Sequence, residues 1–252
     1  LVQWYRQRLW LGKRSDYLRL ALLSLFGITA NQMFFIGGLA KTSAANTSLL
    51  AVTIPIFAIT IGTILGTERP RPLRIIGIIC AAVGVVVLID PRNASFSSET
   101  TIGDIFIIIN SLSFGIYVAT SKEIITRNGP FRSMMCAFIF GSIICVPFGI
   151  FSLSGVDTTA IPWYIWAVVI YIAVGSTAAP YLLNAYALQK VNASTLAVYI
   201  YFQPLIGFLL AVIFLDEKID VAFIFAAALV FIGVFLVTKR TSEPKEGIET
   251  KT

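Results

Sequence analysis

The side chains best able to bind a solute in this sequence are uncharged polar and aromatic ones that recur at helical spacing. Asn110, Ser113, Tyr117 and Ser121 follow the spacing i, i+3, i+7, i+11, which places them on one helical face. Shorter stripes of the same kind are Thr177–Tyr181–Asn184, Ser24–Gly27–Asn31 with Gln32 beside it, and Tyr199–Gln203 before Pro204. Hydroxyls and amides of this kind bind a solute through hydrogen bonds and supply no strong acid or base.

The sequence lacks the residues and motifs that usually support catalysis, metal binding or nucleotide binding. The sequence has no His, which is the commonest general base and metal ligand. Its three Cys lie in apolar stretches, where Cys behaves as a small buried residue. No Walker, HExxH or GxGxxG motif is present. We therefore expect no enzyme, no metal site and no cofactor.

Long apolar segments carry these stripes. The chain is 57% apolar and 13% charged, against about 25% charged in an ordinary soluble domain. Every charged residue lies outside eight windows, which are 20–40, 42–67, 75–89, 105–121, 133–156, 158–189, 191–215 and 221–238. Because a helix crosses the hydrocarbon core with about 20 apolar residues, we expect an all-α integral membrane protein with eight transmembrane helices.

The basic residues predict the orientation of these helices. One set of loops, with both termini, holds 16 of the 19 Lys and Arg residues, and only Lys41, Arg92 and Lys218 lie in the other set. The positive-inside rule then places both termini in the cytoplasm of a multi-pass cell (plasma or inner) membrane protein. The net charge of +6 is thus an orientation signal, so the expected partners are the bilayer and a small-molecule substrate, with no nucleic acid. A homodimer and a monomer are both compatible with these spans.

An internal repeat runs through the chain. Residues 27–30 match residues 175–178 at an offset of 148, and after a one-residue slip Pro55 matches Pro204. Glu68 with Glu217 and Gly84 with Gly233 continue the same register. The copies begin at the first and sixth windows, and since they are five spans apart they must have opposite orientations. Inverted repeats of this kind are typical of secondary transporters, although duplication in a purely structural membrane protein is the alternative.

Two windows precede the second copy of the repeat and none precede the first. We therefore expect a five-plus-five protein whose first two helices are missing from this chain. The predicted organisation is a basic cytoplasmic or interfacial segment (1–16), three helices of the first repeat (17–90), an external loop (91–104), five helices of the second repeat (105–238) and a disordered cytoplasmic tail (239–252).

A family resemblance rests on motifs that occur twice in the same order. The first set is Leu39-Ala40-Lys41-Thr42-Ser43-Ala44-Ala45, Pro55, Gly66-Thr67-Glu68-Arg69 and the Gly77–Gly84 helix; the second is Ala187-Leu188-Gln189-Lys190-Val191-Asn192-Ala193, Pro204 and Leu215-Asp216-Glu217-Lys218. The sequence resembles the EamA-type branch of the drug/metabolite transporter superfamily. The resemblance implies ten helices in two inverted halves around a central cavity, and export or import of small metabolites such as amino acids.

We expect a secondary transporter that exports small metabolites such as amino acids or related amphipathic solutes by alternating access. The residues expected to bind substrate are Asn31, Gln32, Asn110, Tyr117, Asn184, Tyr199, Tyr201 and Gln203. Pro55 and Pro204 are the expected hinges, with static kinks as the alternative. Each polar side chain could instead join neighbouring helices by hydrogen bonds. The alternative for the whole protein is a non-transporting membrane scaffold or assembly subunit.

Overall fold

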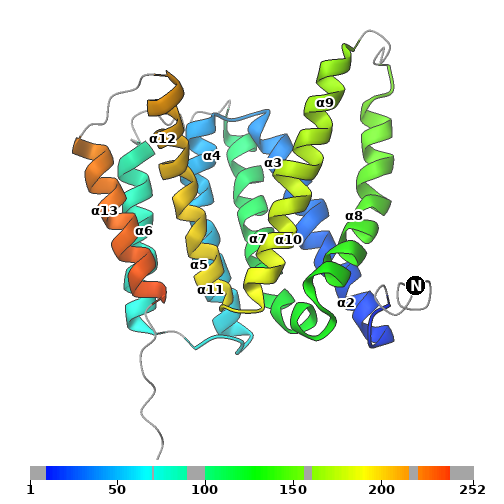
Figure 1. Cartoon of the computed structure of the whole chain (residues 1–252), viewed down its shortest axis with the longest axis horizontal. Coiled ribbons are helices and arrows are strands. Elements are labelled where there is room, and N and C mark those ends of the chain that lie inside the picture. Colours follow the sequence, from blue (N-terminus) through cyan, green and yellow to red (C-terminus); the bar gives the residue numbers. More distant parts are fainter. Residues whose placement is uncertain (1–9, 70, 90–99, 156–160, 216–220, 239–252) are drawn as a thin grey trace, which may run out of the picture.

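The computed structural model of the chain describes residues 10–69, 71–89, 100–155, 161–215 and 221–238. All regular structure among these residues is helical, as the sequence predicts, and the helices stand side by side in one bundle (Figure 1). The helices are α2 (Arg14–Ser24), α3 (Asn31–Leu39), α4 (Ala44–Ala51), α5 (Thr53–Ile64), α6 (Pro72–Ile89), α7 (Thr101–Asn128), α8 (Pro130–Ser152), α9 (Trp163–Tyr171), α10 (Ala179–Leu188), α11 (Ala193–Val198), α12 (Phe202–Leu215) and α13 (Val221–Thr238). The predicted tail, Glu217 and most of segments 1–16 and 91–104 lie outside the described residues.

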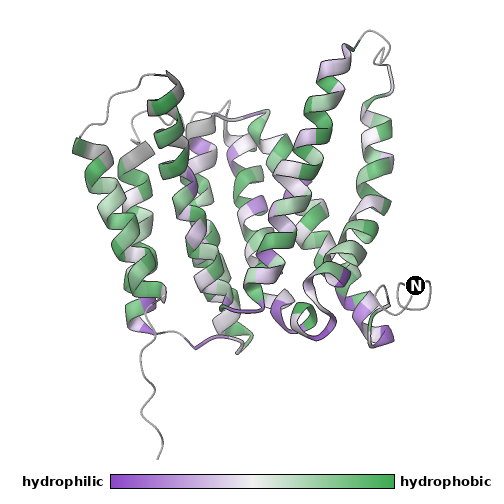
Figure 2. Cartoon of the chain, viewed as in Figure 1, coloured by the Kyte–Doolittle hydropathy of each residue, from purple (hydrophilic) through white to green (hydrophobic). Residues whose placement is uncertain are grey.

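The lengths and compositions of the helices are those of a membrane protein. Five segments are long and apolar enough to cross a bilayer, namely Arg14–Leu39, Asn46–Ile64, Thr101–Asn128, Pro130–Ser152 and Trp163–Leu188. Three shorter apolar helices, Pro72–Val87, Ala193–Ile206 and Ile224–Thr238, fall in the remaining predicted windows. Apolar residues cover the helices along their length, and hydrophilic ones gather at the lower end (Figure 2). A count of eight crossings stays a prediction.

One end of the bundle carries most of the described basic residues. Helix α2 begins there and α13 ends there (Figure 1), and Arg74 and Arg127 lie at the adjacent ends of α6 and α7. We call this the basic end and the other the opposite end. Here Asp16 is fully buried and accepts hydrogen bonds from Arg127 Nε at 3.0 Å and Asn128 Nδ2 at 2.7 Å. The pair ties the start of α2 to the end of α7.

Irregular turns recur at corresponding positions in the chain. The segment α2–α3 contains a π-helical turn at Leu25–Ala30, and α9–α10 contains one at Ile172–Ala178. Adding the offset of 148 to 25–30 gives 173–178. Helix α4 is separated from α5 at Val52, and α11 from α12 by the 3-10 turn Tyr199–Tyr201. Adding 149 to Val52 gives Tyr201, so both pairs of irregularities follow the register of the sequence repeat.

Helices α6 and α13 pack with their backbones in close approach. A Cβ atom on Gly77 would lie 2.7 Å from the Gly233 carbonyl oxygen, and one on Gly84 would lie 2.8 Å from that of Ala226. Only glycine fits such a distance without displacing a backbone. Adding 149 to the number of Gly77 gives Ala226, and adding 149 to that of Gly84 gives Gly233. The Gly77–Gly233 contact and the Gly84–Ala226 contact are therefore equivalent under the repeat.

Candidate functional site

The two helix breaks meet inside the bundle. Tyr201, in the 3-10 turn, is buried, and its hydroxyl donates to the Val52 carbonyl oxygen at 2.7 Å. Val52 and Tyr201 are the corresponding residues of the two repeats, so each break contacts its own counterpart. Thr53 Oγ1 donates to the Leu50 carbonyl at 2.6 Å beside the first break.

Proline explains why backbone acceptors are available at these breaks. A proline has no N–H, so the carbonyl four residues earlier loses its helical donor. Pro55 removes the donor for the Ala51 carbonyl, and Pro204 removes the donor for the Ile200 carbonyl. Both proline positions therefore leave a carbonyl without its α-helical N–H donor at the meeting point of the breaks.

A hollow of about 340 Å³ lies against the paired breaks. Three of the residues that the sequence predicts line it, namely Tyr201, Gln203 and Pro204, and so do Ala51 and Ile200. The other lining residues are Phe35, Thr47, Ser48, Val52 and Val85. The hollow thus lies between α3, α4 and α6 on one side and α12 with its preceding turn on the other. We call it the break pocket.

The break pocket is uncharged and has a few polar groups. The hydroxyls of Thr47 and Ser48 and the amide of Gln203 belong to its lining, and none of the described residues that line it is charged. Gln203 is exposed, and Ser48 is half-buried, so both amide and hydroxyl can meet a solute. An apolar hollow with a few hydrogen-bond donors and backbone acceptors is typical of a small-molecule binding site.

A second group of predicted residues forms a solid polar cluster beside the π-helical turn of α2–α3. Asn110 Nδ2 donates to the Asn31 carbonyl at 2.7 Å. The Tyr181 hydroxyl lies 2.5 Å from the Gly27 carbonyl and 2.8 Å from Asn31 Oδ1. A hydroxyl has one proton, so it donates to one of these, and a rotated Asn31 amide can donate to the hydroxyl oxygen in turn. We call Gly27, Asn31, Asn110 and Tyr181 the polar cluster.

The remaining predicted residues are spread around these two places. Tyr117 is buried with its ring against Gly27, and its hydroxyl lies 3.4 Å from Met134 Sδ. Gln32 and Asn184 are half-buried, and Pro55 is buried in α5. Tyr199 is exposed, and its ring lies 5.7 Å from that of Phe202.

Sequence reasoning missed several residues of both places. Tyr181 lies in a predicted stripe but is not among the predicted substrate-binding residues, although its hydroxyl joins α10 to α3. Thr47 matches Thr195 in the repeat, which was a signal for it. Phe35 and Ser48 line the break pocket without any pattern that marks them.

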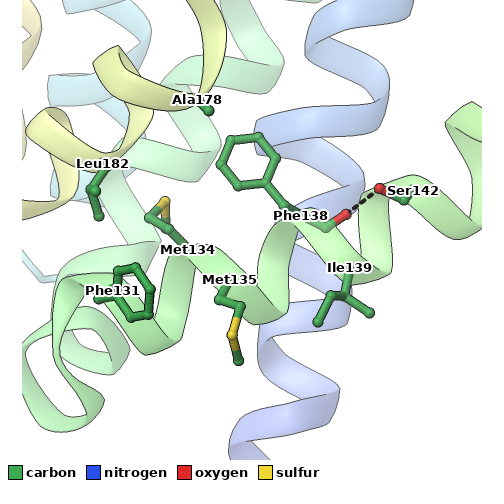
Figure 3. Close-up of a pocket in the computed structure, with 8 residues that line it drawn as sticks. All are labelled: Phe131, Met134, Met135, Phe138, Ile139, Ser142, Ala178 and Leu182. Carbon is green, nitrogen blue, oxygen red and sulfur yellow. Dashed lines mark hydrogen bonds between the residues drawn. The ribbon is translucent and has the colours of Figure 1, made fainter. Parts of the chain in front are cut away.

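A larger hollow of about 510 Å³ lies between α8 and α10 (Figure 3). Its lining residues are Phe131, Met134, Met135, Phe138, Ile139, Ser142, Ala178 and Leu182. Ser142, its one polar side chain, donates to the Phe138 carbonyl of its own helix at 2.7 Å. This apolar hollow has no polar side chain left to select a polar solute, so the break pocket is the better candidate site.

A protein-family model decides the family to which the chain belongs. The model of the EamA-like transporter family matches residues 1–90 and 101–239. The chain belongs to the EamA-like transporter family. It is therefore a multi-pass membrane protein of the transporter class, as the motifs at Pro55 and Pro204 suggest.

Relatives and a solved structure agree with this family. An uncharacterized transporter of Archaeoglobus fulgidus is 28% identical over 227 residues, which cover 90% of this chain and 78% of that protein. The uncharacterized transporter YyaM of Bacillus subtilis is 21% identical over 232 residues, covering 91% and 75% respectively. One crystal structure matches with a TM-score of 0.73 at 18% identity over 89% of this chain and 78% of that one, which supports the fold.

Proposed function

We propose that this EamA-family protein is a secondary transporter that exports small metabolites such as amino acids or related amphipathic solutes. The substrate binds in the break pocket, between the two interrupted helix pairs. The single observation that carries this proposal is the uncharged hollow at two helix breaks that contact each other. Interrupted helices at matching positions of two repeats are the usual substrate site of secondary transporters.

The chemistry of the break pocket favours a solute without net charge. A buried net charge needs a partner of opposite sign, and the described lining offers none. An amino acid has a carboxylate, which can accept from the Ser48 hydroxyl and from the Gln203 amide. The Thr47 hydroxyl already donates to the Ser43 carbonyl of its own helix at 3.0 Å. Its ammonium group can donate to the Ala51 and Ile200 carbonyls. Phe35 and Val85 supply apolar surface for a side chain.

Inverted repeats supply the mechanism in this proposal. The contact of Val52 with Tyr201 joins two residues that correspond in the repeats. The Gly77–Gly233 and Gly84–Ala226 contacts correspond to each other at the offset of 149. Both relations support a twofold relation between the repeats. The family match in two segments supports the same division. Eight helices of a five-plus-five layout then rock about Pro55 and Pro204, so that the break pocket opens to each side of the membrane in turn.

The proposed membrane is the plasma or inner membrane, with the basic end in the cytoplasm. Arg14, Arg74, Arg127 and Lys190 all lie at or next to helix ends on that side of the bundle. This bias supports cytoplasmic termini through the positive-inside rule.

Efflux from cells loaded with labelled amino acids tests the proposal. We expect the protein to speed the loss of at least one amino acid, and we expect the Gln203→Ala variant to slow this efflux about tenfold at equal membrane abundance. Efflux at an unchanged rate in the Gln203→Ala variant would contradict the site and leave the function. No transport of any solute by folded protein would favour the scaffold.

A further inference from the structure

A buried carboxylate joins two parts of the bundle at the basic end. Glu68 Oε1 accepts from the Ser194 backbone N–H at 2.9 Å, and Oε2 accepts from Ser194 Oγ at 2.6 Å. Arg74 Nη1 lies 2.9 Å from Oε2. Glu68 is 9% exposed and Ser194 is fully buried. The contact therefore joins the turn after α5 to the start of α11, 126 residues away.

The turn before Glu68 fixes the carboxylate in this place. Gly66 has a φ of +68°, a left-handed conformation that glycine adopts without strain. The Thr67 and Glu68 N–H groups both donate to the Gly62 carbonyl, at 2.8 and 3.0 Å. This arrangement closes the end of α5. The direction in which Glu68 leaves α5 is thus set locally, and Arg74 holds its charge from α6.

The helix that Glu68 holds begins at the basic end and leads into the 3-10 turn that lines the break pocket. Every residue of α11 is buried, and Ala197 and Val198 pack in the same clusters as Ile54, Ala58 and Ile59 of α5. The same helix continues through the 3-10 turn into α12, which supplies the pocket residues Gln203 and Pro204. A path from the break pocket to the basic end along this interface requires α11 to separate from α5.

A similar carboxylate at the opposite end has a different position. Asp104, in α7, accepts from Thr42 Oγ1 at 2.5 Å and from Asn46 Nδ2 at 2.9 Å. Helix α7 packs along α3 and α5, so these bonds lie within one packed group of helices and do not cross the break pocket. Asp104 is thus a buried carboxylate with hydrogen bonds like those of Glu68, but it does not join α11 to α5.

We propose that the contact of Glu68 with Ser194 is a latch that closes the transport pathway at the basic end. It holds α11 against α5 while the break pocket is shut from this side, and it breaks when the pocket opens here. The inference rests on the proposed function and adds the group that controls one side of the cycle. The Arg74 partner keeps the Glu68 carboxylate aligned in both states, because Arg74 and Glu68 are only six residues apart.

Accessibility of α11 tests the latch without any need for transport. Thr195, next to Ser194, is 8% exposed, and a Thr195→Cys reporter can be placed in a protein whose three cysteines are replaced by Ala. A membrane-impermeant maleimide is applied from the basic end in oriented vesicles. We expect labelling to be at least about tenfold faster with Glu68→Gln, which removes the charge-assisted bonds. Asp104→Asn, the matched control, should change the rate less than about twofold.

Each outcome bears on the latch. Unchanged labelling in a folded Glu68→Gln protein would overturn it, and so would an equal increase in Asp104→Asn. If Glu68→Gln does not fold, Ser194→Ala decides, since it removes only the hydroxyl donor and should still speed labelling severalfold. Faster labelling without transport of any solute would contradict the proposed function and keep the latch. Transport of a solute with unchanged labelling in the Glu68→Gln variant would support the proposed function and overturn the latch.

Discussion

The break pocket and the polar cluster are both built from uncharged polar side chains of the kind the sequence stripes mark, yet they differ in what those side chains do. In the polar cluster, the Asn110 amide and the Tyr181 hydroxyl reach the carbonyls of Asn31 and Gly27. In the break pocket, Gln203 is exposed beside a hollow of about 340 Å³. A polar residue within a membrane bundle can therefore join helices or bind solute, and its partners show which.

The difference between the two places originates in the backbone. The polar cluster lies at a π-helical turn, where Tyr181 of α10 reaches the Gly27 carbonyl of the turn and Asn110 of α7 reaches the carbonyl of Asn31, the next residue after the turn. The break pocket lies where two helices stop and restart before a proline, which removes the donor for the carbonyl four residues earlier. The distinction leads to variants that change one place without the other.

The largest effect is expected when the break pocket is filled. Ser48→Trp puts an indole into the hollow, and we expect transport to fall by about 100-fold or more, equivalent to about 2.7 kcal/mol of lost binding. Ser142→Trp is the matched control, because it fills the apolar hollow between α8 and α10. Uptake or efflux rates per folded molecule measure both. Equal loss in the two variants would contradict the assignment of the site.

A smaller effect is expected from removing one polar group of the break pocket. Gln203→Ala should weaken transport about tenfold, since one solute hydrogen bond contributes about 0.5–1.5 kcal/mol. The melting temperature should not change, because the Gln203 side chain is exposed. A rise in KM with an unchanged melting temperature is the expected signature. A lowered melting temperature with an unchanged KM would place Gln203 with the residues that join helices.

The converse result is expected in the polar cluster. Asn110→Leu removes the donor to the Asn31 carbonyl, and an interhelical bond of this kind contributes about 0.6–2 kcal/mol in a membrane protein. We expect a lower melting temperature, and transport per folded molecule within about a factor of two. Thermal unfolding in detergent and transport at matched abundance measure the two quantities. A selective loss of transport with full stability would move Asn110 into the substrate site.

The smallest effect is expected at a residue that both lines the break pocket and joins two helices by a hydrogen bond. Tyr201 lines the break pocket and also donates to the Val52 carbonyl at 2.7 Å. Tyr201→Phe keeps the ring and removes the bond, so we expect a loss of about 0.5–1.5 kcal/mol in stability and less than about a threefold change in transport. A tenfold loss of transport at full stability would show that the hydroxyl contacts the solute.

Much of the fold could be predicted from three patterns in the sequence, namely the charge-free windows, the polar stripes and the internal repeat. Charge-free windows predict the helices, and the stripe Asn110, Ser113, Tyr117 and Ser121 predicts a buried face of α7, where all four residues are indeed buried. The repeat register predicts that Pro55 and Pro204 stand in equivalent places, and the breaks at Val52 and Tyr201 fall in that register. The count of spans and the twofold relation remain predictions.

The division of polar residues between the two places did not follow from the sequence. Asn110 and Gln203 have similar side chains in similar apolar surroundings, and only the neighbours brought by other helices separate them. Phe35 and Ser48 lie far from Gln203 in the chain, and their meeting depends on how α3 and α4 pack against α12. Helical spacing reports which face is buried, but it does not report what lies opposite that face.

Protection by substrate tests the central claim most directly. Ser48→Cys and Ser142→Cys are placed separately in the protein without its native cysteines, and the rate of modification by a small thiol reagent is measured with and without the transported solute. We expect the solute to slow modification of the Ser48→Cys variant severalfold and to leave the Ser142→Cys variant unchanged. Protection at position 142 alone, or no protection at position 48 at saturating solute, would contradict a substrate site at the paired helix breaks.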